Sequence, residues 1–223
     1  MVPPSSPGGE VVVIPPELRP GVKLSHYVGV LGMPGWTAYS GLTRIGRLKC
    51  PGETVLVSGA AGVCGAMVGQ MAKMLGCRVI GTAGSEDKLR HLTSALGFDA
   101  AVNYQVHGNA ESMGRELREA APGGIDFYFD NTAGHVTTAA WPLLNDGARV
   151  AVSGGIAHYY GEPPWWSHAV WYKDLPPEED GSAPIGSTAM GAGPVTTVSR
   201  GRRITVEGLS WQDLQRREPY EAE

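Results

Sequence analysis

Three glycines at a regular spacing constrain this chain more than any other feature. Gly59, Gly62 and Gly65 recur at every third position. They follow the apolar run Thr54–Ser58 and open the helical pattern Gly62–Leu75. In a strand–turn–helix unit the first glycine permits a tight turn, the second lets main chain approach a diphosphate, and the third lets the helix pack close. The pattern predicts a dinucleotide-binding turn; the alternative is a glycine turn that serves packing alone.

Apolar strands and amphipathic helices alternate through the middle of the chain. Further strands are expected at Arg78–Ala83, Ala100–Tyr104, Ile125–Asp130 and Ala148–Gly154, and helices at Ser85–Leu96, Ala110–Ala120 and Val136–Leu144. These strands are nearly continuous apolar runs, as is typical of a parallel sheet that is covered on both faces. The predicted fold class is α/β, a Rossmann-type doubly wound parallel sheet with right-handed crossovers.

The two ends of the chain differ from this middle. Residues 1–48 form an irregular N-terminal connector, in which helical pieces run from Leu24 to Ile45 and break near Pro34. Residues 49–161 form the dinucleotide-binding domain, and residues 162–202 form a long Pro/Gly-rich insertion without regular structure. We expect one returning strand within Ile204–Trp211, in a segment 203–223 that ends in a frayed tail.

Composition excludes several classes of function. The net charge of -4 and the pI near 5.9 indicate no basic surface for nucleic acid. Three cysteines and six scattered histidines form neither a disulfide framework nor a zinc motif. No run of 18 apolar residues and no signal peptide is evident. We therefore expect a cytoplasmic protein with no metal site and no membrane contact.

The choice between NAD and NADP depends on the residues after the second predicted strand. Thr82–Ser85 contains no carboxylate at the place where an acidic residue would hold the ribose 2′-hydroxyl. Lys88 follows one turn into the next helix and can reach a 2′-phosphate, although Glu86 and Asp87 are close to it. From spacing alone, a phosphate-binding lysine and an ordinary solvated lysine both remain open.

Five segments in order carry a family resemblance: LGMPGWTAY (31–39), AAGVCGAMVGQMAK (60–73), LGFDAAVNY (96–104), IDFYFDNTAG (125–134) and GGIAHY (154–159). Together they resemble the zinc-free branch of the medium-chain dehydrogenase/reductase superfamily. The group in question contains the prostaglandin reductases and the alkenal double-bond reductases. Members reduce the C=C bond of α,β-unsaturated ketones and aldehydes with NADPH. The resemblance therefore implies an NADP(H) cofactor, an enone or enal substrate and hydride transfer without a metal.

The resemblance also implies a role for individual residues. Cofactor-binding positions are Gly62, Val63, Cys64, Gly65, Lys88, Tyr104, Asn131, Ser153, Gly154, Ile156 and Thr37. Among them, Lys88 and Tyr104 match the pair that handles the adenosine 2′-phosphate. Tyr159 matches a tyrosine near the substrate and is the predicted catalytic residue, which donates a hydrogen bond to the substrate carbonyl.

One departure from the family leaves the activity open. Family members place a GroES-like β-barrel before the Rossmann unit, whereas residues 1–48 match only the junction with that barrel. The leading interpretation is an enone reductase, inactive if the substrate cleft lacks one wall. The alternatives are a non-catalytic NADP-binding protein and a dimerisation partner that pairs through a sheet edge near residues 204–211. A homodimer is the candidate assembly.

Overall fold

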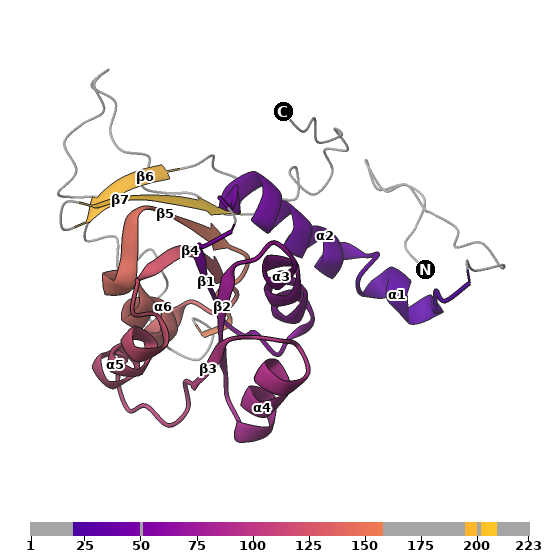
Figure 1. The fold of residues 1–223 in the computed structure, drawn as a ribbon, viewed down its shortest axis with the longest axis horizontal. Helices are drawn as coiled ribbons and strands as arrows, with labels where there is room; N and C mark the ends of the chain where they lie inside the picture. Colours follow the sequence, from indigo (N-terminus) through magenta and orange to yellow (C-terminus); the bar gives the residue numbers. More distant parts are fainter. Residues whose placement is uncertain (1–19, 50, 158–194, 200–201, 209–223) are drawn as a thin grey trace, which may run out of the picture.

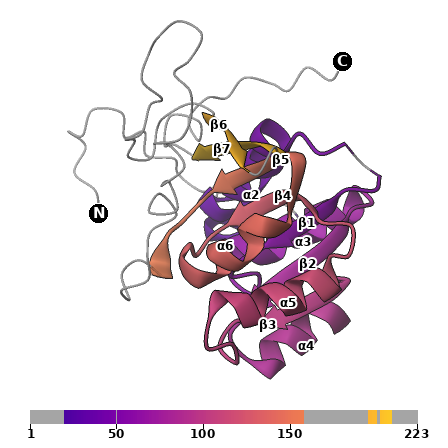
Figure 2. The ribbon, with the colours of Figure 1, turned by 90° about the vertical axis from the view of Figure 1, so that its left-hand side faces the viewer.

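A single sheet organises this protein. The computed structural model describes residues 20–49, 51–157, 195–199 and 202–208. Within them, the sheet has seven strands in the order β3-β2-β1-β4-β5-β7-β6. The strands are β1 (Thr54–Val57), β2 (Arg78–Ala83), β3 (Ala100–Asn103), β4 (Ile125–Asp130), β5 (Leu144–Val152), β6 (Val195–Ser199) and β7 (Arg202–Gly208). All neighbouring pairs are parallel except β6 with β7. Figure 2 shows β3 at one end of the sheet and β6 with β7 at the other.

Helices cover both faces of the sheet (Figure 1). They are α1 (Leu24–Val28), α2 (Met33–Ser40), the π-helix η1 (Gly41–Gly46), α3 (Val63–Met74), α4 (Glu86–Ser94), α5 (Ala110–Ala120), α6 (Gly134–Ala140) and the 3₁₀ turn η2 (Trp141–Leu143). Residues of α2, η1, α3 and α4 pack on one face, and residues of α5 and α6 pack on the other. From β3 to β7 the strand order is the doubly wound one, which confirms the predicted Rossmann-type fold.

Alternating side chains of the central strands supply both cores. On β1, Val55 and Val57 join the core under α3, while Leu56 joins the core under α5 and α6. Phe127 and Phe129 on β4 likewise point to the first core and Tyr128 to the second. All of these side chains are fully buried. Each contributes about 1.5–3 kcal/mol of burial free energy, so a strand with two covered faces is apolar throughout.

The element boundaries differ from the prediction where one proline intervenes. The helix expected over Val136–Leu144 begins earlier, at Gly134, and ends at Ala140. Pro142 lies in the 3₁₀ turn that follows, because proline has no N–H with which to continue an α-helix.

The prediction was wrong for part of the C-terminal segment. Residues 195–199, expected to be irregular, form β6, which pairs with β7 in antiparallel fashion. Strand β7 lies between β5 and β6, so the strand expected within residues 204–211 is not a free edge. The hypothesis that two chains pair through that strand as a free edge is therefore wrong. The homodimer and the domain limits stay predictions. Tyr159 and the rest of residues 158–194 lie outside the described part.

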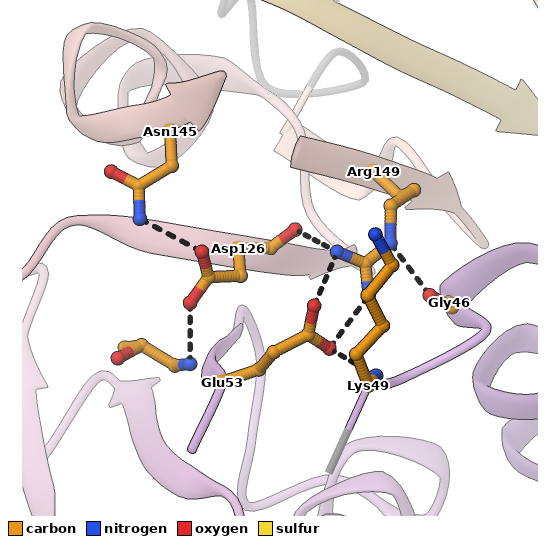
Figure 3. Close-up of polar contacts among 7 residues, drawn as sticks. Gly46, Lys49, Glu53, Asp126, Asn145 and Arg149 are labelled. Carbon is orange, nitrogen blue, oxygen red and sulfur yellow. Dashed lines mark hydrogen bonds and ion pairs between the residues drawn. The ribbon is translucent and has the colours of Figure 1, made fainter. Parts of the chain in front are cut away.

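A partly buried ion pair fixes the segment after α2 to the amino end of the sheet (Figure 3). The Arg149 guanidinium on β5 donates to both carboxylate oxygens of Glu53 at 2.9 and 2.8 Å. Its Nε donates to the carbonyl of Gly46 at 2.6 Å, and the Lys49 amide donates to Glu53 at 2.7 Å. Close by, Asp126 accepts from the Thr54 amide and from Asn145 Nδ2, both at 2.8 Å. The carboxyl end of the sheet, where ligands bind in this fold, is free of these links.

Candidate dinucleotide site

The glycine-rich turn joins β1 to α3 at the carboxyl end of the sheet. Gly59 has φ +57°, a conformation that disfavours other residues, and its carbonyl accepts from the Gly62 amide at 3.0 Å. The Ala60 amide donates to the carbonyl of Thr82 at 2.9 Å and ties the turn to β2. A Cβ on Gly65 would lie 2.6 Å from the Gly59 carbonyl oxygen and 2.7 Å from Ala60 Cα. The third glycine is therefore required by the close approach of the helix to the turn.

The start of α3 suits an anion. Gly62 is its N-cap residue, and no side chain among those described caps the helix there. The first turn holds no acidic residue, and Val63 is 60% exposed. Uncapped amides at a helix start can bind phosphate oxygens, aided by the helix dipole. Cys64 is half-buried, and burial raises the pKa of its thiol, so this side chain lines the turn as a neutral group.

Two further predicted segments meet this turn at the point where the strand order reverses. The side-chain amide of Asn131 donates to the Ser58 carbonyl at 2.7 Å, and its main-chain amide donates to Ser58 Oγ at 2.8 Å. A Cβ on Gly154 would lie 2.7 Å from the Asn131 carbonyl oxygen. The Ser153 and Gly154 amides donate to the carbonyl of Asp130 at 2.8 and 3.1 Å. The structure thus brings together the turn, Asn131 and the pair Ser153–Gly154.

A buried carboxylate lies behind these segments, and the sequence analysis did not select it. Asp130 is the last residue of β4 and is fully buried. Its Oδ1 accepts from Ser58 Oγ at 2.9 Å, and its Oδ2 accepts from Thr137 Oγ1 at 2.6 Å. Thr137 also contacts the Tyr128 hydroxyl at 3.1 Å. Burial, followed by the negative charge of Asp130, raises the pKa of Tyr128 well above its usual value. The signal in the sequence that could have identified Asp130 is a carboxylate directly after the buried aromatic run Phe127–Phe129.

The second half of the predicted site lies at the ends of β2 and β3. A Cβ on Gly84 would lie 2.7 Å from the Tyr104 hydroxyl, so this hydroxyl occupies the space of any side chain at position 84. Lys88 is exposed on the first turns of α4. Its acidic neighbours have partners of their own: Glu86 accepts from Asn103 Nδ2 at 2.8 Å, and Asp87 pairs with Arg90. Neither carboxylate is therefore committed to Lys88.

Two predicted residues in the described part of the chain are not joined to these groups. Thr37 is buried on α2, which packs against α3, and its hydroxyl is directed to Met33 Sδ at 3.5 Å. Ile156 is 55% exposed beyond β5. Tyr159 lies outside the described residues. Among the residues that are described, no group of three His, Cys, Asp or Glu side chains could hold a metal ion.

Comparison with known proteins finds similar sequences over the middle of the chain. The chain matches the zinc-binding dehydrogenase family over residues 63–167. It is 48% identical to the NADPH-dependent curcumin reductase of Escherichia coli over 60% of this chain and 38% of that protein. It is 46% identical to the NADP(+)-dependent 2-alkenal reductase of Nicotiana tabacum over 62% of this chain and 39% of that protein. Over the matched region this chain is therefore similar to NADP-dependent reductases.

A solved structure is similar to the same part of the chain. CurA from Vibrio vulnificus in complex with NADPH superposes with a TM-score of 0.59 at 41% identity, covering 66% of this chain and 43% of CurA. The chain thus spans about two fifths of the length of these reductases. No helix in the described part is both long and apolar enough to cross a membrane.

Proposed function

We propose that this chain binds NADPH and serves a reductase that reduces the C=C bond of α,β-unsaturated ketones and aldehydes. The observation that carries the proposal is the uncapped start of α3 against the Gly59–Gly65 turn, at the reversal of the strand order. The likeness to reductases whose names specify NADPH or a 2-alkenal supports this cofactor and this substrate class.

Different residues of the chain bind different parts of the cofactor. The amides of Val63, Cys64 and Gly65 bind the diphosphate, since no side chain of the described residues occupies that position. Lys88 and the Tyr104 hydroxyl bind the 2′-phosphate, and the absence of a side chain at Gly84 leaves room for this hydroxyl. When bound, NADPH supplies the hydride that adds to the β-carbon of the substrate.

The remaining groups orient the reacting end. Asn131, Ser153, Gly154, Ile156 and Thr37 border the nicotinamide. Tyr159 donates a hydrogen bond to the substrate carbonyl, which stabilises the negative charge that develops on its oxygen during hydride addition. The α-carbon then takes a proton to complete the reduction.

The decisive experiment titrates the full chain with NADPH and with NADH, following cofactor fluorescence. We expect NADPH to bind more tightly, and Lys88→Ala to remove most of that preference. Lys23→Ala, which removes an exposed charge before α1, serves as the matched control. Equal affinity for NADPH and NADH in the unmodified chain would contradict the 2′-phosphate assignment, and failure to bind either would refute the whole proposal.

A panel of 2-alkenals then separates catalysis from binding. Oxidation of NADPH that depends on the alkenal supports the reductase. Binding without oxidation favours the alternative from the sequence, a non-catalytic NADP-binding protein. Tyr159→Phe tests the proposed donor, and we expect it to lower turnover with little change in NADPH affinity.

A further inference from the structure

We propose that Asp130 is a positioning residue. It holds three cofactor-binding segments in place before the dinucleotide binds: the glycine-rich turn, the Asn131–Ala133 turn and the pair Ser153–Gly154. The inference rests on the proposed function and adds a residue that touches neither cofactor nor substrate. Its basis is the number of separate segments that meet at one buried residue at the end of β4.

The carboxylate links the first segment to the second. Asp130 Oδ1 accepts from Ser58 Oγ, and Ser58 directly precedes the glycine-rich turn. The same oxygen accepts from the amides of Thr132 and Ala133 at 3.0 and 2.9 Å. Ser58 Oγ in turn accepts from the Asn131 amide. One carboxylate oxygen therefore sets the distance between the phosphate-binding turn and the Asn131–Ala133 turn.

The conformation of Ala133 shows what the carboxylate maintains. Ala133 has φ +58° and ψ -154°, a region that is unfavourable for a residue with a Cβ. It is the N-cap residue of α6, and no side chain caps that helix. The hydrogen bond from the Ala133 amide to Asp130 holds this strained residue in place. Without this acceptor, we expect Ala133 to leave its unfavourable conformation and to shift the turn that carries Asn131.

The other two oxygens of Asp130 accept hydrogen bonds from α6 and from the segment after β5. Oδ2 accepts from Thr137 Oγ1 inside α6, while the main-chain carbonyl accepts from the Ser153 and Gly154 amides after β5. The four donors to the carboxylate, two hydroxyl groups and two main-chain amides, are all neutral, and their hydrogen bonds stabilise a carboxylate that burial would otherwise penalise. A site held in place in this way does not have to be reorganised when the cofactor binds.

The same strand offers a matched control. Asp126 lies at the amino end of β4 and also accepts two hydrogen bonds, from the Thr54 amide and from Asn145. Figure 3 shows this carboxylate beside the Glu53–Arg149 pair. Replacing Asp126 disturbs the same strand without touching the cofactor segments.

The experiment measures ligand affinity of the full chain for Asp130→Ala, Asp130→Asn and Asp126→Ala, at a temperature where circular dichroism shows each variant folded. We expect Asp130→Ala to raise the Kd for NADPH about tenfold or more, since it removes four hydrogen bonds to the carboxylate and one such bond is worth about tenfold in an equilibrium constant. Asp130→Asn should recover most of this loss, because its amide oxygen can replace Oδ1. We expect Asp126→Ala to change the Kd less than about twofold despite a lower stability.

A fragment of the cofactor distinguishes positioning from general loosening. Adenosine 2′-monophosphate carries the phosphate assigned to Lys88 and Tyr104 and lacks the diphosphate assigned to the glycine-rich turn, so Asp130→Ala should weaken its binding much less than that of NADPH. Equal loss of both ligands, or equal effects of Asp130→Ala and Asp126→Ala, would overturn the inference. If Asp130→Ala does not fold, Ser58→Ala removes the hydroxyl that links the glycine-rich turn to Asp130 and to the Asn131 amide, and it must likewise weaken NADPH more than the adenosine fragment. A wild-type chain that binds no NADPH would instead refute the proposed function itself.

Discussion

Replacing Gly65 by alanine tests the packing of the glycine-rich turn most directly. The added Cβ would lie 2.6 Å from the Gly59 carbonyl oxygen and 2.7 Å from Ala60 Cα, and real Cβ atoms are essentially never closer than 3.0 Å to such neighbours. Both neighbours are main-chain atoms, so no side-chain rotation relieves the contact. The start of α3 must move away from β1.

The expected magnitude is a balance of two terms. Overpacking of this kind costs about 1–3 kcal/mol, whereas alanine in place of glycine inside a helix gains about 0.5–1 kcal/mol. The net free energy of unfolding should fall by about 1–2 kcal/mol. Because the same movement displaces the amides of the first turn, we expect the Kd for NADPH to rise about tenfold or more.

Gly114 on α5 is the matched control. A Cβ there would meet only the Ala139 carbonyl oxygen, at an ordinary contact distance of 3.5 Å. Gly114→Ala should therefore stabilise the chain by about 0.5–1 kcal/mol and leave NADPH affinity unchanged. Urea unfolding followed by circular dichroism measures the first quantity, and NADPH fluorescence measures the second. A Gly65→Ala chain that is as stable as the wild type would refute the reasoning.

Two further predictions concern charged groups away from the site. Arg149→Met or Glu53→Gln alone should lower the free energy of unfolding by about 1–3 kcal/mol, because each leaves a partly buried charge without its partner. The double variant should lose clearly less than the sum of the two, and strict additivity in urea unfolding would contradict a direct pair. Burial alone would raise the pKa of Asp99, but its hydrogen bonds from Lys73 and from the Val79 amide outweigh burial and lower it. The contribution of the Asp99 carboxylate to the free energy of unfolding is therefore present above its unfolded pKa of about 3.9. It is lost as the pH falls through its lower pKa in the folded state. Asp99→Asn should cost about 1 kcal/mol at neutral pH and flatten the fall in stability with acid; an unchanged acid profile would argue against the pair.

Local pattern was sufficient for the central fold. The apolar runs from Thr54 to Asp130 and the glycines between and after them predicted every strand and helix up to α5 within a few residues. They could do so because a strand buried on both faces must be apolar, and a tight turn needs glycine, whatever the rest of the chain does. Strand β6 escaped prediction, since Val195–Ser199 is surrounded by Gly, Ser and Pro and is an edge strand that pairs only with β7.

The glycine turn and its position between strand and helix are properties of neighbouring residues, so the sequence alone determined where a diphosphate would lie. The tertiary structure decided what holds that turn in place. Ser58 and Asp130 are 72 positions apart in the chain, and Glu53 and Arg149 are 96 apart, yet each pair shares hydrogen bonds. No local periodicity records such contacts, because they arise only when parallel strands are set side by side and their ends meet at one edge of the sheet.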